Sequence, residues 1–360
     1  MPLNPKTRRA LSIVHGLSSL VAGALVSFAC AHVPPSNVTR DRFDYAEALA
    51  QSWKRQTLMN VVHIRYADAP FFLDVTSVIN TYSRGNTVNA SATVHPTWDA
   101  DVATAGATGT WSNSPTVTYQ PVTGEKFARQ LLRPIPPASL LQMMEAGWPA
   151  RLILPIAVRT VNGIRGQVLG RVADPEFIEL TEALDSIQQA DGLGFRISAA
   201  KPGENVMLVL SREDREAVRE KQEKVRKLLG LAPGLKEVEV AFGSVSRNPA
   251  EIAMVTRSMV EIMLEVGAGI DVPAAHREEG RVIPLGMTET SRAVAEPLVH
   301  IHSGPAAPAD AYAETRYQGY AFWIDDRDVR SKRVFSFLML LFSLAESGQP
   351  SAAPLVTISK

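Results

Sequence analysis

The chain lacks most of the features that identify an enzyme or a nucleic-acid-binding protein from its sequence. It has no G-x-S-x-G elbow, no H-E-x-x-H zinc motif and no Walker loop, so common signatures of hydrolases, zinc proteases and nucleotide-binding proteins are missing. Its 37 basic and 37 acidic residues cancel, which leaves no excess positive charge for a nucleic-acid partner. These absences favour a non-enzymatic protein with no cofactor and no nucleic-acid partner.

Cysteine is almost absent as well. Cys30 is the only cysteine among 360 residues, so the chain cannot form an internal disulfide. An unpaired thiol in an oxidising compartment is reactive unless it serves another purpose. The residues around Cys30 indicate such a purpose.

The first thirty residues differ from the rest of the chain. Residues 1–9 carry three cations and no acid, and residues 10–29 are uncharged and rich in leucine, valine, alanine, serine and glycine. A basic segment followed by an apolar stretch with small residues at its end is typical of a secretory signal peptide. The alternative is an uncleaved membrane anchor, since the stretch approaches the ~20 residues that span a bilayer, although its glycines, serines and His15 disfavour a permanent span.

Residues Val26–Ala29 and the following Cys30 resemble the lipobox of bacterial lipoproteins, in which the cysteine is diacylated and becomes the mature N-terminus. Ala29 fits the small residue before the cysteine, whereas the two residues before Ala29 depart from the pattern. The resemblance implies a membrane-lipid partner through acylated Cys30. Ala31, in place of an aspartate, implies sorting to the periplasmic face of the outer membrane. Ordinary signal cleavage at an A-x-A-like site around Cys30 is the alternative.

The rest of the chain predicts an α+β protein behind the 1–29 signal peptide. Residues 30–43 are expected to form a lipid-anchor tether, because consecutive prolines favour extended backbone. Residues 44–121 are expected to contain a helix and a small antiparallel β-region, and residues 122–360 a mixed α/β body. The helix, at about 44–65, follows from small and apolar residues spaced three and four apart with no glycine or proline.

The β-region is predicted from residues 71–119, which are rich in threonine, valine, serine and small residues and carry few charges. In residues 87–94 apolar and polar side chains alternate throughout, as in a strand with one buried face. Further strands are expected at 102–111 and 115–119 with a turn between them. Residues 71–83 predict another strand, with a helix as the alternative.

The C-terminal part alternates between helices and strands. Residues 151–242 have the order β-α-β-β-α-β if the apolar run 151–161 is a strand, and this order resembles that of ferredoxin-like modules. The Asn-Pro-Ala-Glu motif at 248–251 combines an N-cap residue, an early proline and a capping-box glutamate, which predicts a helix from there to about Val266. The apolar segment 334–344 is too short to span a bilayer and predicts a buried helix.

Two groups of side chains have the chemistry of metal ligands. His300 and His302 lie two apart on an expected strand, so both rings point to one side, but no third ligand is evident nearby in the sequence. The simpler interpretation is a pair of polar residues on a solvated strand face. Asp325, Asp326 and Asp328 lack the spacing and glycine of a calcium-binding loop, so helix capping is their expected role.

Together these observations predict a non-enzymatic, outer-membrane-associated lipoprotein that acts as a structural or assembly component of an envelope complex. Its partner would be an envelope protein or further copies of the same chain. The segment 320–326 resembles parts of uncharacterised bacterial envelope lipoproteins, which implies no activity. Two alternatives stay open: a periplasmic hydrolase or metal-dependent enzyme that uses His300, His302 and the aspartates at 325–328, and a subunit of an oligomeric outer-membrane pore.

The lipid-anchor hypothesis predicts the effect of replacing Cys30. The Cys30→Ala protein should move from the membrane pellet to the soluble periplasmic fraction, because residues 31–360 contain no apolar run long enough to hold it in a bilayer. Cell fractionation and immunoblotting measure the distribution. Full retention of the variant in the membrane would instead support an uncleaved N-terminal helix.

Overall fold

A computed structural model describes residues 35–93, 102–169, 171–197, 206–210, 215–285 and 296–346. It has the α+β architecture that the sequence predicts, with a helix and a two-stranded sheet followed by a mixed α/β body. The chain divides into two compact units, Met1–Ala50 with Val78–Val117 and Gln51–Ser77 with Thr118–Lys360. The expected signal peptide and Cys30 lie outside the described residues.

The first described helix, α2 (Pro35–Arg65), begins earlier than the sequence predicts. The tether expected at 30–43 is therefore mostly helical, because a proline is tolerated in the first turn of a helix, where its missing N–H would have no partner. Near the end of α2, Leu58 and Val61 are fully buried, while Phe43 in its first half is 67% exposed. Among the described side chains of α2, those that contact the hydrophobic core lie in its second half.

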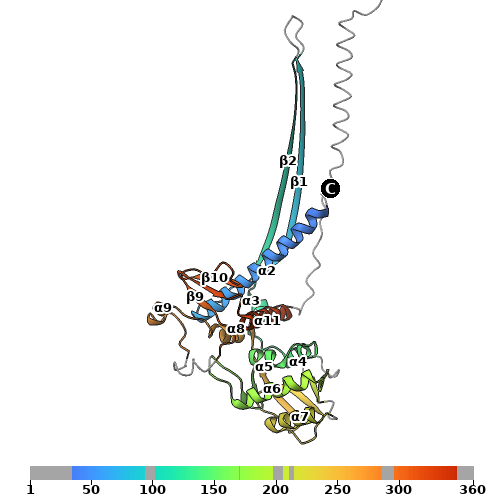
Figure 1. Ribbon diagram of the computed structural model, residues 1–360, viewed down its shortest axis with the longest axis vertical. Coiled ribbons are helices and arrows are strands. Elements are labelled where there is room, and N and C mark those ends of the chain that lie inside the picture. Colours follow the sequence, from blue (N-terminus) through green and yellow to red (C-terminus); the bar gives the residue numbers. More distant parts are fainter. Residues whose placement is uncertain are drawn as a thin grey trace, which may run out of the picture. The chain divides into compact units, whose positions relative to one another are not determined.

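Strands β1 (Leu73–Thr93) and β2 (Val102–Pro121) form a two-stranded sheet and run side by side (Figure 1). The N–H of Val122 donates to the carbonyl of Phe72 at 3.0 Å, just before β1 and just after β2. Further along, the Thr76 hydroxyl lies 3.3 Å from the carbonyl oxygen of Thr118. These pairings make the two strands an antiparallel hairpin.

Both strands of the hairpin are longer than the sequence predicts. A single strand, β1, runs through most of the two segments expected as separate strands at 71–83 and 87–94. The prediction of a turn between 102–111 and 115–119 is wrong, because β2 continues through these residues. Serine, asparagine and proline favour turns locally, but pairing with a neighbouring strand overrides such preferences.

A six-stranded mixed sheet lies at the centre of the α/β body, in the spatial order β4-β3-β8-β7-β6-β5. Strands β7 and β8 are parallel, and the other neighbours are antiparallel. The chain order β3-α6-β5-β6-α7-β7 is the expected β-α-β-β-α-β, with the short β4 after β3, and β8 lies between β3 and β7. The strands are β3 (Val158–Val161), β4 (Ile164–Arg165), β5 (Leu193–Ile197), β6 (Val206–Leu210), β7 (Glu237–Phe242) and β8 (Glu251–Thr256).

Helices α4, α5, α6 and α7 gather against this sheet (Figure 1). Leu141, Leu154 and Leu180 extend from the first three of these helices into one apolar layer. Leu229 of α7 and Leu208 of β6 complete the layer, which buries the apolar face of the sheet. The helices of this region are α3 (Gly124–Phe127), the π-helix η1 (Ala128–Leu132), α4 (Pro137–Glu145), α5 (Ala150–Ala157), α6 (Pro175–Gln189) and α7 (Glu216–Leu229).

The apolar run 151–161 is divided between α5 and β3, so most of it is helical. Buried Arg257 closes the end of that helix, since its guanidinium donates to the carbonyl oxygens of Pro155 and Ile156 at 2.7 and 2.8 Å. Carbonyls at the end of a helix lack intrahelical partners, and a cation there also complements the helix dipole. Burial lowers the pKa of Arg257, and Glu265 opposes this shift.

Strand β8 occupies a stretch for which the sequence predicts the start of a helix, so that prediction is wrong. The Asn248 side-chain oxygen does accept the N–H of Ala250 at 2.8 Å, but this bond closes a turn and not the start of a helix. The chain then extends, since β8 pairs with a strand on each side. The helix α8 (Met259–Gly267) begins later, with a capping box between Ser258 and Glu261.

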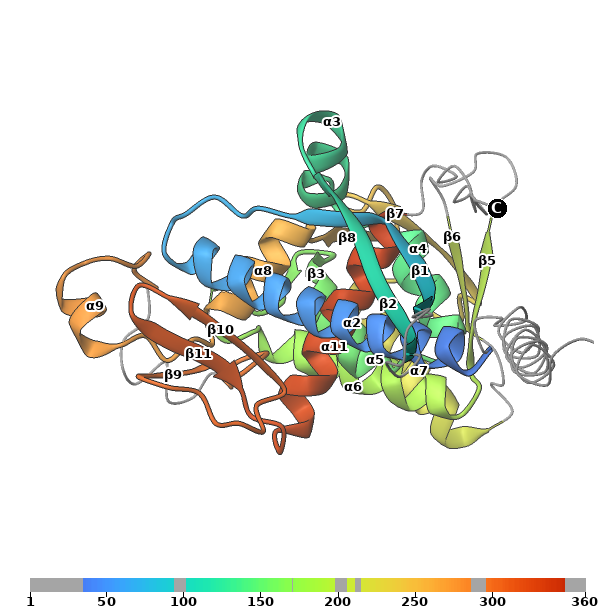
Figure 2. The same ribbon diagram turned by 90° about the horizontal axis from the view of Figure 1, so that it is seen from above.

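A second, three-stranded antiparallel sheet has the order β10-β11-β9. The turn between β10 and β11 has a positive φ at both central residues, 44° at Gln318 and 86° at Gly319. The larger angle falls on the glycine, which adopts it without strain. The short helix α9 lies beside this sheet (Figure 2), where the ring of His276 packs 4.9 Å from that of Tyr320. These elements are α9 (Ala274–Glu278), β9 (His302–Gly304), β10 (Ala313–Tyr317) and β11 (Tyr320–Ile324).

The helix α11 (Val329–Glu346) contains the apolar segment expected to be buried, and Phe335, Phe337 and Leu338 are fully buried. Asp328 caps its first turn, with one carboxylate oxygen 2.9 Å from the Ser331 backbone nitrogen and the other 2.6 Å from the Ser331 hydroxyl. The capping role expected for Asp328 is confirmed. Among the described helices, none combines the length and apolar character needed to cross a membrane.

A backbone bridge joins the end of α8 to the segment that enters β9. Ile270 pairs in parallel with Ile301, whose N–H donates to the Gly269 carbonyl at 3.0 Å and whose carbonyl accepts the Asp271 N–H at 2.8 Å. A Cβ atom added at Gly269 would overlap the carbonyl oxygen of Val299. The two backbones therefore approach this closely only because residue 269 is glycine.

Replacing Gly269 by alanine should destabilise the protein by about 1–3 kcal/mol, because the new methyl group forces the bridged segments apart. Gly243→Ala is the matched control, since no atom lies within 4 Å of a Cβ added at Gly243 and its φ is not in the left-handed region. Urea denaturation followed by circular dichroism measures both free energies of unfolding. Equal stability of the two variants would contradict the close approach at Gly269.

The Asp328 cap predicts a specific dependence of stability on pH. Partial burial raises the pKa of Asp328, but the Ser331 hydroxyl and backbone N–H outweigh it, so the carboxyl pKa is lowered overall. A carboxylate with a depressed pKa stabilises the fold at pH values above its pKa in the unfolded chain, about 4, and this contribution is lost as the pH falls through its pKa in the folded protein. Asp328→Ala should lower the free energy of unfolding by about 1 kcal/mol at pH 7 and by less at pH 3.

Asp328→Asn separates the two parts of that effect, because the amide oxygen still accepts a hydrogen bond but carries no charge. Thermal unfolding of both variants between pH 3 and pH 7 gives the comparison, with Asp326→Ala as a control for an exposed aspartate that pairs with Lys332. A stability difference between the wild-type protein and Asp328→Ala that does not change with pH would contradict the lowered pKa.

Candidate functional site

The backbone bridge places three polar side chains on one side of the chain. Ile270 and Ile301 face the core, with exposures of 7% and 0%. Neighbouring residues in extended segments point to the opposite face, so Asp271, His300 and His302 point outward together. The arrangement confirms that the two histidine rings share a side, and it adds a carboxylate that is 29 residues away in sequence.

The three side chains converge through their polar atoms. Nε2 of His300 lies 2.8 Å and Nδ1 of His302 lies 3.6 Å from the same oxygen, Oδ2 of Asp271. The ring centroids of the two histidines are 4.1 Å apart. One ligand atom from each residue lies within 4.8 Å of both others, so a single ion between them can contact all three.

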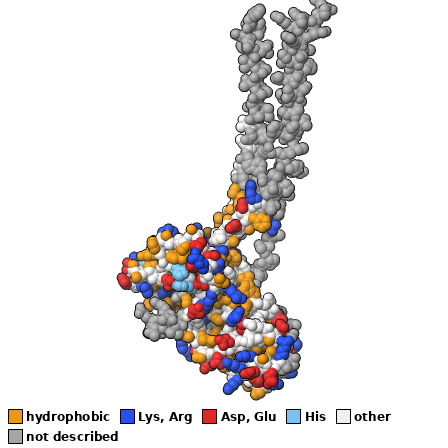
Figure 3. Space-filling model, viewed as in Figure 1, with side chains coloured by type: hydrophobic (Ala, Val, Ile, Leu, Met, Phe, Trp, Pro, Cys, Tyr) orange, Lys and Arg blue, Asp and Glu red, His pale blue; other side chains and the backbone are white. Residues whose placement is uncertain are grey.

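The cluster is open to solvent. The side chains of Asp271, His300 and His302 are 59%, 44% and 32% exposed. Histidine side chains form a patch bordered by acidic side chains on the face that Figure 3 shows. Water therefore reaches the ligand atoms from outside, and an ion bound here would keep solvent ligands.

Surrounding residues hold the cluster in place. The ring of His302 stacks on Trp323, its partner across the β9–β11 pairing, with 5.6 Å between centroids and 26° between planes. The backbone N–H of His300 donates to the Ser331 hydroxyl at 2.8 Å, which ties the site to the capped end of α11. The Ser303 hydroxyl donates to the backbone carbonyl of Asp271.

The other aspartates suggested by the sequence do not converge on the histidines as ligands. Asp325 accepts the backbone N–H of Arg327 at 2.8 Å, and Asp326 pairs with Lys332 at 2.6 Å. Asp328 caps α11 through Ser331. Each carboxylate thus serves a separate local contact, and Asp271 is the carboxylate that joins the histidines.

His276 is committed to a structural contact. Its Nδ1 is hydrogen-bonded to the Tyr66 hydroxyl at 2.7 Å, and the side chain is buried. Burial raises the pKa of Tyr66 to about 12, although nearby Arg65 opposes the shift, so the phenol stays neutral at physiological pH. A buried ring held by a neutral phenol is poorly placed to bind an ion from solvent.

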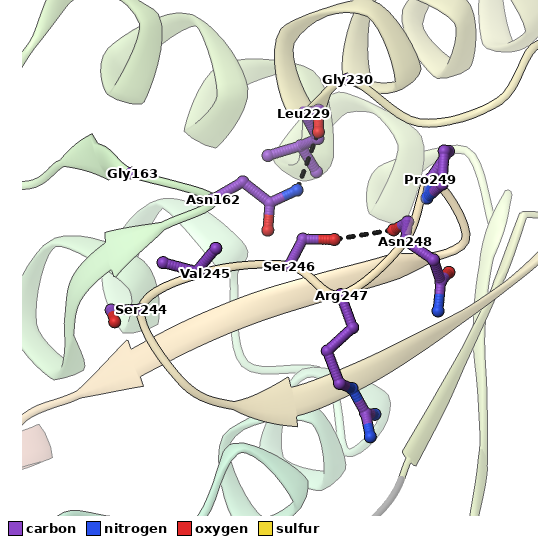
Figure 4. A pocket seen from close by; sticks show the side chains of 10 residues that line it. All are labelled: Asn162, Gly163, Leu229, Gly230, Ser244, Val245, Ser246, Arg247, Asn248 and Pro249. Atoms are coloured by element: carbon purple, nitrogen blue, oxygen red, sulfur yellow. Dashed lines mark hydrogen bonds between the residues drawn. The ribbon is translucent and has the colours of Figure 1, made fainter.

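An open pocket of about 490 Å³ lies elsewhere in the α/β body, along the loop 244–249 (Figure 4). Asn162 points toward Leu229 and donates to its carbonyl at 2.7 Å, so this amide is used in holding the end of α7. Arg247 extends away from Asn162 and binds the carboxylate of Glu251. The cation in the lining is therefore already paired, which disfavours an anion site.

Comparison with known proteins gives no family for this chain. No protein-family model, no curated protein and no solved structure matches it.

Proposed function

We propose that this protein is an outer-membrane-associated lipoprotein that acts as a structural subunit of an envelope complex and assembles with further copies of itself along the edges of the β1–β2 hairpin. The observation that carries the proposal is the unpartnered hairpin itself. Both of its strands are long, and no other described strand pairs with either of them. The lipid anchor at Cys30 supplies the location and is tested separately.

An unpaired strand edge exposes backbone N–H and C=O groups that can pair with another chain. A two-stranded hairpin is at best marginally stable alone in water, and it gains stability when further strands are added. β1 and β2 contain 21 and 20 residues, far more than the usual 3–10. Pairing between copies would satisfy both free edges.

The composition of the hairpin supports the same conclusion. Proteins usually protect exposed edges with charged residues, prolines or bulges. Strand β2 has no charged residue, and β1 has only Asp74 and Arg84. Pro115 protects β2 at one interior position, and the rest of the strand's interior lacks such protection. Val75, Ile79 and the Tyr119 ring are exposed. Such a surface favours association over solvation.

An oligomeric pore is a second candidate, in which the same assembly inserts its hairpins into the membrane. A strand needs ~9–11 residues to cross a bilayer, and each strand of the hairpin exceeds that length. Free edges are not tolerated in lipid, so insertion would require a closed ring of hairpins from several copies. The metal-dependent enzyme is a weaker candidate and rests on Asp271, His300 and His302 alone.

Thr108→Pro tests assembly through the hairpin. Thr108 lies in β2 with an exposed side chain. Proline there removes one backbone N–H of the strand and disfavours pairing along it, so the variant should be monomeric where the wild-type protein is oligomeric. Thr108→Val is the matched control, because valine keeps the N–H and favours strands. Native mass spectrometry of the detergent-solubilised proteins measures the oligomeric state.

A monomeric wild-type protein, or an oligomer that survives Thr108→Pro, would contradict assembly through the hairpin. Ion conductance of liposomes that contain the wild-type oligomer then separates its two forms. A conducting oligomer identifies the pore, and a silent one identifies the scaffold.

A further inference from the structure

We propose that Asp271, His300 and His302 form a binding site for a divalent transition-metal ion, with zinc as the expected occupant. The inference does not rest on the proposed assembly, because it depends only on the bridge between the end of α8 and the start of β9. The site would use three protein ligands and leave the remaining positions to water.

The distances fit a metal ion at the centre of the cluster. Zinc binds histidine nitrogen and carboxylate oxygen at about 2.0–2.2 Å, so ligand atoms around a tetrahedral ion lie about 3.4 Å apart. The two nitrogen-to-oxygen distances, 2.8 and 3.6 Å, lie on either side of that value. One ligand atom from each of the three residues lies within 4.8 Å of the other two, and binding would bring these atoms to the tetrahedral spacing by rotation of the side chains.

The donor set selects the class of ion. Two imidazoles with one carboxylate suit zinc and its first-row neighbours, whereas magnesium and calcium prefer oxygen ligands alone. His302 presents Nδ1 to the cluster while His300 presents Nε2. Two histidines two residues apart can therefore approach one ion from different ring edges.

The surroundings give the site the supporting contacts that metal ligands require. Ligand orientation in metal sites depends on neighbouring hydrogen bonds and packing. Here Trp323 fixes the plane of the His302 ring, Ser331 holds the backbone of His300, and Ser303 holds the backbone of Asp271. The three ligands are thus positioned by separate contacts that do not involve an ion.

A bound ion would fasten two segments that otherwise meet through the backbone bridge. Asp271 follows α8, and the histidines lead into β9 of the three-stranded sheet. Ligation would add bonds between these segments on the solvent side, opposite the buried Ile270 and Ile301. Metal binding should therefore stabilise the folded chain by mass action.

Isothermal titration calorimetry of the full-length protein, purified without a polyhistidine tag, tests the site directly with zinc chloride. We expect saturable binding at this cluster and a higher midpoint of thermal unfolding with zinc but not with magnesium. Asp271→Asn should weaken this binding by at least about tenfold, and His300→Asn with His302→Asn should weaken it further. Cobalt in place of zinc should give visible absorption bands that the double histidine variant lacks.

Asp310→Asn is the matched control for Asp271→Asn, because Asp310 is an exposed carboxylate that pairs with Arg327 at 3.3 Å. Its zinc affinity should equal that of the wild-type protein. Unfolding midpoints in chelator show whether each variant is folded. The proposal fails if the wild-type protein binds no zinc, or if folded Asp271→Asn and double histidine variants bind it as tightly as the control.

Discussion

The need of backbone N–H and C=O groups for partners governs the structure of this protein. In the six-stranded sheet the backbone of each inner strand pairs with a strand on both sides, and β8 lies between β3 and β7. The bridge at Ile270 and Ile301 meets it between two irregular segments and turns Asp271 toward the histidines. In the hairpin β1 and β2 pair with each other, but no other described strand pairs with the second edge of either strand, and this is the observation behind the proposed assembly.

The same requirement explains how the helices of the body end and begin. Arg257 reaches from the far end of β8 to the last carbonyls of α5, and the Ser258–Glu261 capping box opens α8 directly afterwards. Asp328 opens α11 through Ser331. Because each closure is made by a side chain, consecutive elements can follow one another over very short connections.

Much of the fold could be predicted from local patterns. The helices near 44–65 and 334–344 follow from apolar periodicity or an apolar run that the tertiary structure uses directly. The helix predicted from Asn248 to about Val266 begins only at Met259. Asn248 accepts a local N–H as a cap would, but the strands on either side of β8 determine the structure of residues 251–256. Local sequence contains no information about neighbours that are distant in the chain.

The candidate site, like the fold, could be predicted only in part from the sequence. The alternation of a strand was enough to place His300 and His302 on one side. Asp271 has no local signal, since it follows a glycine-rich helix end that resembles many others, and only the pairing of Ile270 with Ile301 brings it to the histidines. The length of β1 and β2 was also hidden, because turn-forming residues interrupt the pattern without interrupting the strand.

The separation of Asp271 from His300 has a consequence for the unfolded chain. A bond between them closes a loop of about thirty residues, and a fixed cross-link of that span removes entropy worth about 3.5 kcal/mol from the unfolded state in the chain-entropy description. With Cys30 as its sole cysteine, the protein has no internal disulfide for this purpose. An ion at the cluster would be a reversible cross-link. The stability that it adds would depend on the free metal concentration of the compartment and not on its redox state.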